Sequence, residues 1–267
     1  MNLQVSDGCF SYKADKPILR NLNFELNEGQ ILCVLGQNGA GKTTLLRCLT
    51  GFLKWNSGYT YFNGKQMNGI SSLAKVSYVP QVHPVIFPYT AVEMVCMGKA
   101  KSKRFFELPT YMDREQAIEI LKSIGIEELM HRKCSQMSGG QLQLVYLARA
   151  LIDDPELLIL DEPESHLDFK NQALIFDIIT GLVKSKRLSC IINTHYPEHA
   201  LRISDYSLFL GSNGRYVFGE SSLVINEDNI KRFFDISVRI LDLKHFGVDQ
   251  KTFVIGRNQE NIISGDF

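Results

Sequence analysis

The sequence predicts an α/β fold with a mostly parallel core sheet, an antiparallel β subdomain and a helical subdomain. Short, mainly apolar runs at residues 31–35, 157–160 and 190–194 suit strands that are buried on both faces. Before the first of these runs, Leu22 and Phe24 belong to an alternation of apolar and polar residues, which is typical of a half-buried strand. The N-terminal region therefore mixes antiparallel strands with a parallel core strand.

The remaining N-terminal strands follow from turn residues. Residues 58–62 predict a strand that enters a hairpin turn at Asn63 and Gly64. Residues 76–79 predict a short strand that Pro80 ends, which leaves Gln81 just beyond it.

The loop after residues 31–35 carries the phosphate-binding pattern G-x-x-x-x-G-K-[ST], which runs from Gly36 to Thr43. Glycines let several backbone N–H groups point at one anion, and Lys42 adds a mobile positive charge. The Thr43 hydroxyl can ligate Mg²⁺, and the helix expected next directs the positive end of its dipole at the phosphates. A glycine turn that binds nothing is the alternative, but strand, loop and helix stand in the required order. The sequence therefore predicts a P-loop NTPase fold that binds a nucleoside triphosphate.

Residues 82–153 are largely helical in pattern and form the predicted helical subdomain. Thr90 and Glu93 form a capping box, so a helix should begin at Ala91. A small basic cluster at residues 99–104 is read either as a solvated loop or as a contact with a partner.

Two further helix starts lie in this region. Asp113 and Gln116 suit a cap for a helix that precedes Gly125. Ser138 and Gln141 form another capping box, and the two glycines between them leave an open helix N-terminus that suits an anion. As a helix start alone, this SGGQ sequence is weak support for a ligand.

Polar residues end two of the buried strands. Asp161 and Glu162 follow residues 157–160, and an acidic residue at such a place is where a nucleotidase holds Mg²⁺. An adjacent Asp-Glu pair is usually a surface pair, but the buried strand before it favours the functional reading. His195 ends the run 190–194 in the same way, although a lone histidine is more often structural.

The C-terminal half predicts a helix at residues 169–184 and strands at 206–210 and 216–218. From residue 221 the chain reads as a small appendage without recognisable chemistry. We therefore expect one main domain at residues 1–220 and the appendage at residues 221–267.

Composition limits the function classes. Among 267 residues, 29 Lys and Arg balance 29 Asp and Glu, which disfavours a nucleic-acid partner. The six cysteines stand singly, as reduced thiols in a cytosolic protein do. The first residues lack a basic region followed by an apolar one, so we expect no signal peptide, and no apolar run is long enough to span a bilayer.

Taken together, these residues resemble the ATP-binding cassette (ABC) family of ATPases over nearly all of residues 1–220. The resemblance rests on ordered motifs: GQNGAGKT, VPQ ending at Gln81, MSGGQ at residues 137–141, LLILDEP, SHLD at residues 165–168 and NTH ending at His195. The SGGQ sequence is the most specific of them, because other phosphate-loop kinases and GTPases lack it.

The resemblance implies a role for each motif residue, with ATP as substrate and Mg²⁺ as cofactor. Glu162 matches the general base, His195 the residue that contacts the γ-phosphate, and Lys42 and Gln81 complete the catalytic set. Thr43, Gln81 and Asp161 belong to the Mg²⁺ environment. The residues implied to bind nucleotide are Tyr12, Gly36, Gln37, Asn38, Gly39, Ala40, Gly41, Lys42, Thr43 and Thr44 in one chain, with Ser138, Gly139, Gly140, Gln141 and Asp168 at the junction with a second copy in a head-to-tail homodimer.

Residues 87–100 and the DEPESHLD sequence look like the ATPase subunits of bacterial and archaeal metal-chelate importers. Such subunits sit on the cytoplasmic face of transmembrane permease subunits and power uptake of iron–siderophore complexes, haem or cobalamin, and in close relatives molybdate or tungstate. A substrate-binding protein outside the membrane is an indirect partner. Glu164 stands where this group usually has Thr, and Met137 replaces the usual Leu.

Residues 84–99 follow Gln81 and carry apolar Val92, Met94, Val95 and Met97 on a capped helix. We expect this segment to form much of the groove that receives a permease helix. The alternative is that these side chains belong to the core.

Two other functions remain open. The first is a soluble ABC ATPase of the iron–sulfur assembly type without a permease; the long coiled coil of repair ATPases and the second cassette of translation factors are both missing from the sequence. The second is a nucleotide-gated scaffold that hydrolyses slowly, against which the presence of Glu162 and His195 argues.

Overall fold

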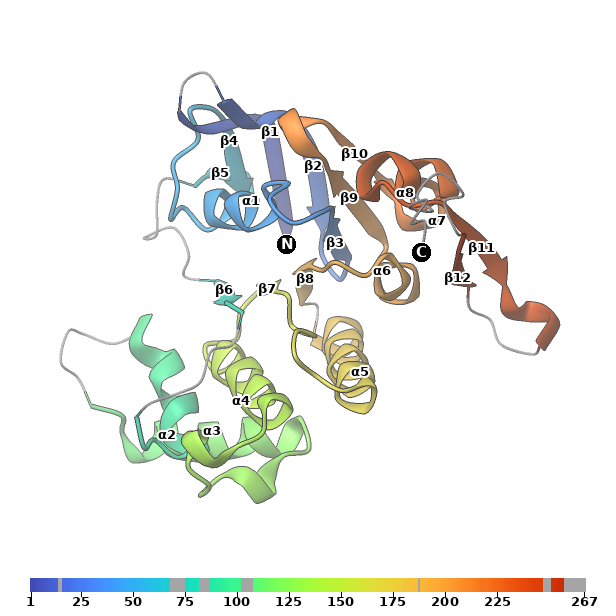
Figure 1. The fold of residues 1–267 in the computed structure, drawn as a ribbon. Helices are drawn as coiled ribbons and strands as arrows, with labels where there is room; N and C mark the ends of the chain where they lie inside the picture. Colours follow the sequence, from blue (N-terminus) through green and yellow to red (C-terminus); the bar gives the residue numbers. More distant parts are fainter. Residues whose placement is uncertain are drawn as a thin grey trace, which may run out of the picture.

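The protein is described by a computed structural model that covers residues 1–13, 16–67, 75–81, 87–101, 108–186, 188–246 and 251–256. Its central element is a six-stranded sheet with the strand order β10-β9-β3-β8-β7-β6 (Figure 1). Strand β10 runs antiparallel to β9, and the other neighbouring pairs are parallel. The predicted α/β fold with a mostly parallel core sheet is therefore confirmed. The strands are β3 (Ile31–Leu35), β6 (Val76–Val79), β7 (Leu157–Asp161), β8 (Ser189–Asn193), β9 (Tyr206–Leu210) and β10 (Tyr216–Glu220).

The central strands are apolar throughout because both faces of the sheet are covered. In β3, Ile31 and Cys33 belong to one buried cluster, while Leu32 and Val34 belong to another on the opposite face. The first cluster includes helices α4 (Gly139–Leu151) and α5 (Phe169–Lys186), and the second includes α1 (Lys42–Leu49). Alternate side chains of a strand point to opposite faces, so a strand between two apolar layers must be apolar at every position.

An antiparallel sheet covers the α1 side of the molecule (Figure 1). Its order is β2-β1-β4-β5, from β1 (Asn2–Lys13), β2 (Lys16–Asn27), β4 (Ser57–Phe62) and β5 (Lys65–Gln66). The Asn63-Gly64 turn joins β4 to β5, and both residues have the positive φ angles, 50° and 73°, that this hairpin requires. The predicted antiparallel subdomain and its hairpin are confirmed.

Helices α2 (Ala91–Cys96), α3 (Tyr111–Ser123) and α4 form the helical region (Figure 1). Capping boxes start α2 at Thr90 and α4 at Ser138, as predicted. The predicted cap of the middle helix is wrong: Thr110 caps α3, and its hydroxyl and backbone N–H both bond to the Asp113 carboxylate. Gln116 lies inside the helix, where its amide donates to the backbone oxygen of Ile152 over 3.0 Å.

The apolar side of α2 faces inward. Val92, Met94 and Val95 are all at most 7% exposed and pack in the same cluster as α4. For these side chains the core reading is correct, and the expectation that they line an open groove is wrong. The expected groove also included residues 84–86, and the basic cluster included residues 102–104; these lie outside the described residues.

The C-terminal elements extend the core. They are α6 (Pro197–Ile203), α7 (Ser221–Val224), α8 (Glu227–Phe234), β11 (Val238–Asp242) and β12 (Lys251–Ile255), with 3₁₀ turns at Met97–Lys101, Glu127–Leu129, Cys134–Gln136, Ser212–Gly214 and Leu243–Phe246 along the chain. Phe233 of α8 is buried, and its ring lies 5.4 Å from that of Phe209 in β9. The apolar packing therefore continues across residue 220. The predicted boundary there between the main domain and the C-terminal appendage stays a prediction. Within the described part of the chain, no helix is both long and apolar enough to span a bilayer.

Candidate active site

The loop between β3 and α1 is shaped by its glycines. Gly36 has a φ of 150°, and a Cβ atom there would lie 2.2 Å from the backbone oxygen of Leu210. Gly41 has a φ of 100°, and its Cβ would lie 2.5 Å from a methyl carbon of Ile18. A side chain at either position would force the loop away from β9 or β2. Between them, Gln37, Asn38 and Gly39 are exposed and Ala40 is buried, while Thr43 and Thr44 are half-buried at the start of α1.

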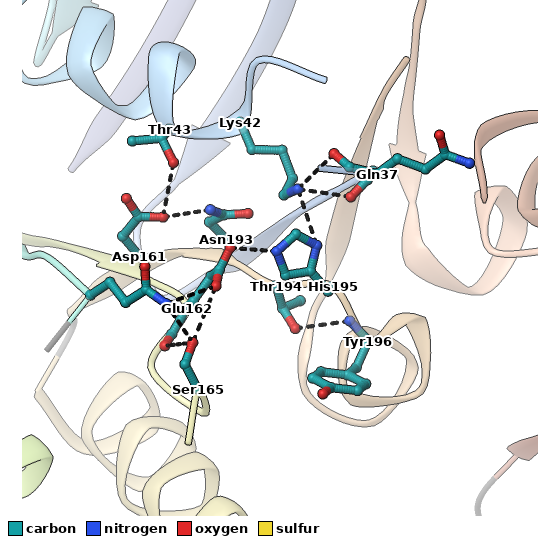
Figure 2. Close-up of polar contacts among 12 residues, drawn as sticks. Gln37, Lys42, Thr43, Asp161, Glu162, Ser165, Asn193, Thr194, His195 and Tyr196 are labelled. Atoms are coloured by element: carbon teal, nitrogen blue, oxygen red, sulfur yellow. Dashed lines mark hydrogen bonds and ion pairs between the residues drawn. The ribbon is translucent and has the colours of Figure 1, made fainter. Parts of the chain in front are cut away.

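Lys42 points back into this loop. Its Nζ atom donates to the backbone oxygens of Gly36 at 2.8 Å and Gln37 at 3.0 Å, and it lies 3.2 Å from Nδ1 of His195. Burial lowers the pKa of Lys42 to about 8, although the nearby carboxylates of Glu162 and Asp161 oppose that shift. The charged end of Lys42 is thus held where the loop and the end of β8 meet (Figure 2).

Asp161, the last residue of β7, is 6% exposed and surrounded by donors. Its Oδ1 accepts hydrogen bonds from the Asn193 amide and from the Thr43 hydroxyl, the latter at 3.5 Å. Its Oδ2 accepts the Tyr78 hydroxyl at 3.0 Å. Burial and the Asp161 carboxylate raise the pKa of Tyr78 well above its usual value, so this hydroxyl remains a donor. Thr43 and Asp161 were predicted from their motifs, whereas Tyr78 and Asn193 were not.

Glu162 follows with a φ of 50° and joins the ends of three strands. Its Oε2 accepts the Gln81 amide at 3.3 Å and the Ser165 hydroxyl at 3.2 Å, while its Oε1 contacts Nε2 of His195 (Figure 2). The Lys42 ammonium has no lone pair, so Nδ1 of His195 accepts from it and Nε2 carries the proton donated to Glu162. The contact of Ser165 with Glu162 was not predicted from the sequence.

The SGGQ residues form a separate group with Asp168. The Ser138 hydroxyl accepts the Gln141 backbone N–H at 3.3 Å, and a Cβ on Gly140 would lie 2.9 Å from the Asn171 side chain. Asp168 in turn accepts the Asn171 backbone N–H at 2.8 Å. The starts of α4 and α5 therefore lie together, with Gly139 exposed between them. Within the described residues, this group makes no hydrogen bond to the loop that holds Lys42.

Tyr12 lies near the end of β1 and is 59% exposed, with its ring set edge-on to that of Phe10 at 5.0 Å. Strand β1 pairs with β2, and Ile18 of β2 contacts Gly41. Tyr12 is thus an exposed aromatic side chain on the sheet that borders the glycine loop.

Comparison with known proteins agrees with these motifs. A family model described as "ABC transporter" matches residues 19–165, and a model of an AAA domain matches the shorter span 132–199. The molybdate import ATP-binding protein MolC of Haemophilus influenzae is 32% identical, with 88% of each chain covered. A probable iron chelatin transport ATP-binding protein of Helicobacter pylori is 34% identical over 88% of this chain and 93% of that protein.

A solved structure gives the same answer for the fold. It is described as an inward-facing conformation of an ABC transporter of the metal-chelate type, and it aligns with a TM-score of 0.86 and 30% identity. The alignment covers 96% of this chain and 97% of that chain. With the family model covering more than half of the sequence, the chain belongs to the ABC transporter family of ATP-binding proteins, which are ATPases.

Proposed function

We propose that this chain is the ATP-hydrolysing subunit of a membrane importer, and that Glu162 is the general base. The observation that carries the proposal is the double contact of Glu162, which accepts the Gln81 amide on one oxygen and meets His195 on the other. Gln81 follows β6 and His195 follows β8, the two strands that flank β7. The Glu162 carboxylate is therefore held in place before any substrate binds. The relatives named for molybdate import and iron chelatin transport support the importer assignment.

ATP is expected to bind along the glycine loop. Backbone N–H groups and the N-terminus of α1 would meet the phosphates, and Lys42 would exchange its carbonyl partners for phosphate oxygens. The exposed ring of Tyr12 is suited to stack on the adenine. Residues 138–140 would meet the γ-phosphate of ATP held by a second copy, with Asp168 at the junction, which makes the ATP-bound form a head-to-tail homodimer.

The residues around Asp161 fit Mg²⁺. They offer hard oxygen donors, namely the Asp161 carboxylate, the Thr43 hydroxyl 3.5 Å away and the side-chain oxygen of Gln81. Mg²⁺ prefers one or two carboxylates together with water and phosphate oxygens. A protein-only metal site, with three or more His, Cys, Asp or Glu side chains placed to hold a metal, is not found among the described residues. When bound, Mg²⁺ would neutralise charge on the phosphates.

Hydrolysis then requires a general base and groups that stabilise the negative charge on the phosphoryl group. Glu162 would accept a proton from the water that attacks the γ-phosphorus in line, while Gln81 and Ser165 keep its Oε2 in place. Lys42 and the loop N–H groups would stabilise the negative charge on the transferred phosphoryl group. His195 donates to Glu162 through Nε2, and this N–H would turn to the γ-phosphate when ATP binds.

The proposed cargo is a metal chelate such as an iron–siderophore complex, haem or cobalamin. Molybdate or tungstate is the second candidate, because MolC is among the relatives. A soluble ATPase of the iron–sulfur assembly type remains an alternative. Cargo is selected by membrane and external subunits, so the proposed cargo rests on resemblance to relatives and not on a residue of this chain that contacts it.

Purification of the native complex tests these alternatives. Recovery of a polytopic membrane protein with this chain, and metal analysis of the bound cargo, would support a metal-chelate importer. Purification alone or with iron–sulfur carrier proteins would instead favour the assembly ATPase. On the importer reading, the chain lies on the cytoplasmic face of the membrane, bound to its permease, with a substrate-binding protein outside.

We place the permease contact on exposed apolar side chains rather than on the buried side of α2. Phe87 and Tyr89 precede α2 and are 63% and 38% exposed, while Tyr111 and Met112 at the start of α3 are 74% and 75% exposed. Exposed aromatic and methionine side chains are enriched at protein interfaces.

A further inference from the structure

The turn after β7 contains a buried carboxyl group that the hydrolysis scheme does not use. Glu164 is 1% exposed, and its Oε1 accepts the hydroxyl of Thr194. Within the described residues its other oxygen, Oε2, has no hydrogen-bond partner. Carboxyl groups are rarely buried this deeply, because the lost hydration must be replaced by partners within the protein. The Thr194 contact is therefore the main polar interaction of this side chain.

Thr194 lies where β8 turns toward α6. Its backbone N–H donates to the oxygen of Val34 in β3 at 3.1 Å, and its hydroxyl accepts the backbone N–H of Tyr196 at 3.1 Å (Figure 2). The residue between them is His195. Burial raises the pKa of Glu164, and the backbone N–H of His195 is among the groups that oppose this shift. The hydroxyl of Thr194 thus links the turn that carries His195 to the turn that carries Glu162.

The turn at Glu162 has two further backbone hydrogen bonds, one to the end of β8 and one within the turn. The backbone N–H of Glu162 donates to the oxygen of Asn193 at 3.0 Å, and the Ser165 N–H donates back to the Glu162 oxygen at 3.1 Å. These bonds hold Glu162 but leave the backbone around His195 dependent on Thr194 and Tyr196. The orientation of the imidazole, which must meet both Lys42 and Glu162, follows from that backbone.

We propose that Glu164 is a positioning residue, which fixes the orientation of His195 by accepting the hydroxyl of Thr194. The proposal rests on the hydrolysis scheme above for its effect on rate, but the positioning itself is a property of the folded chain. Loss of the Thr194 hydroxyl loosens the turn at His195 while the loop that binds the phosphates keeps its own contacts. We therefore expect kcat to fall while the affinity for ATP changes little.

The test uses two substitutions in the full chain. Thr194→Val keeps the shape of the side chain but removes the hydroxyl, and Thr194→Ser keeps the hydroxyl. We expect the Val variant to lower kcat about tenfold, with the KM for ATP within about twofold of wild type, and the Ser variant to recover most of the lost turnover. Thr50→Val is the matched control, because Thr50 is fully buried and its hydroxyl donates to the Leu46 oxygen at 2.8 Å, at the end of α1 away from the phosphate loop.

A spectroscopic measurement separates positioning from hydrolysis. In protein labelled with ¹³C at histidine, the His195 imidazole signals can be assigned by their loss in His195→Gln. They should shift or broaden in Thr194→Val and stay in place in Thr194→Ser and Thr50→Val. Unmoved His195 signals in a Val variant that still binds ATP would overturn the proposal, as would an equal loss of kcat in Thr50→Val. If the wild type hydrolyses no ATP while the His195 signals respond as expected, the hydrolysis scheme fails and the positioning stands.

Discussion

The side-chain amide of Gln81 donates to Oε2 of Glu162 over 3.3 Å, although 80 residues of chain separate the two positions. Gln81 stands two residues beyond β6, and Glu162 stands one residue beyond β7. The two strands pair in parallel from Val76 with Leu157 to Val79 with Leu160, so their C-terminal ends reach the same sheet edge. The contact is therefore fixed by strand register.

Glu162→Gln should leave ATP bound but stop turnover. The amide keeps the size and hydrogen-bonding ability of the carboxylate but cannot accept a proton from water. We expect hydrolysis to fall by about 10²–10⁴-fold, the usual contribution of a positioned base. Phosphate release by the purified variant with Mg²⁺ and ATP measures this, and normal turnover would remove Glu162 from the role of base.

The same variant tests the shared site. If residues 138–140 of each chain meet the ATP of the other, the variant should be a dimer with ATP and Mg²⁺, while wild-type protein without its permease should be mostly monomeric. Sedimentation of both proteins with and without nucleotide decides the point. An inactive variant that stays monomeric with saturating ATP would keep the base but count against the dimer.

Lys42→Ala should abolish ATP binding at micromolar concentrations while leaving the fold intact. Loss of a charge-assisted contact of this kind costs about 1.5–3 kcal/mol or more. Titration calorimetry measures the affinity, and far-ultraviolet circular dichroism checks the fold. Lys54→Ala provides a control, because Lys54 is exposed and lies in the loop after α1. Equal ATP affinity in the two variants would contradict the placement of Lys42 on the phosphates.

Glu164→Gln should change how stability depends on pH. Burial raises the pKa of Glu164 to about 7 from an ordinary value of 4.5, with smaller opposing effects from Thr194 and backbone donors. Because the folded chain disfavours the charged form, this group costs no stability at acidic pH and destabilises the fold as pH rises from 4.5 through 7, by about 3 kcal/mol in all. The Gln variant lacks this dependence.

The measurement is the free energy of unfolding by denaturant for both proteins between about pH 5 and about pH 8. Relative to wild type, the Gln variant should gain stability as pH rises. Glu119→Gln is the control, because the Glu119 side chain is 68% exposed on α3, and it should show little change across the same range. A pH-independent difference between wild type and Glu164→Gln would contradict the raised pKa.

A cysteine in place of Met112 should crosslink to the permease in the assembled complex. Met112 is 75% exposed, whereas five of the six native cysteines are buried and react slowly. Ser123→Cys, exposed at the far end of α3, is the negative control. Crosslinks from position 123 with none from position 112 would move the permease contact to another surface.

The sequence motifs predicted the parallel sheet and the residues that meet at its edge, but not the partners that hold those residues. Asn193 bonds to Asp161 because β8 lies between β3 and β7, although it follows both in the chain. Neither periodicity nor motif spacing contains this strand order. The role of Tyr78 could not be predicted from the sequence for the same reason, since only the pairing of β6 with β7 brings its hydroxyl to the Asp161 carboxylate.

The sequence pattern gave the wrong cap for α3 because two residue pairs have the same i, i+3 spacing. Thr110 with Asp113 and Asp113 with Gln116 both fit the i, i+3 pattern of a cap, and the structure uses the first pair. Helix α6 was not predicted, because its seven residues are too few to display a clear period. The assigned roles of the site residues stay predictions until the variants above are measured.

The contact between Lys42 and His195 has a consequence for nucleotide binding. Lys42 already has three partners, the oxygens of Gly36 and Gln37 and Nδ1 of His195. If ATP binds along the glycine loop as proposed, its phosphate competes with these partners, so each binding event would include an exchange of hydrogen bonds. The same exchange would free His195 from the ammonium group, so one side-chain contact would connect the proposed phosphate site to the end of β8.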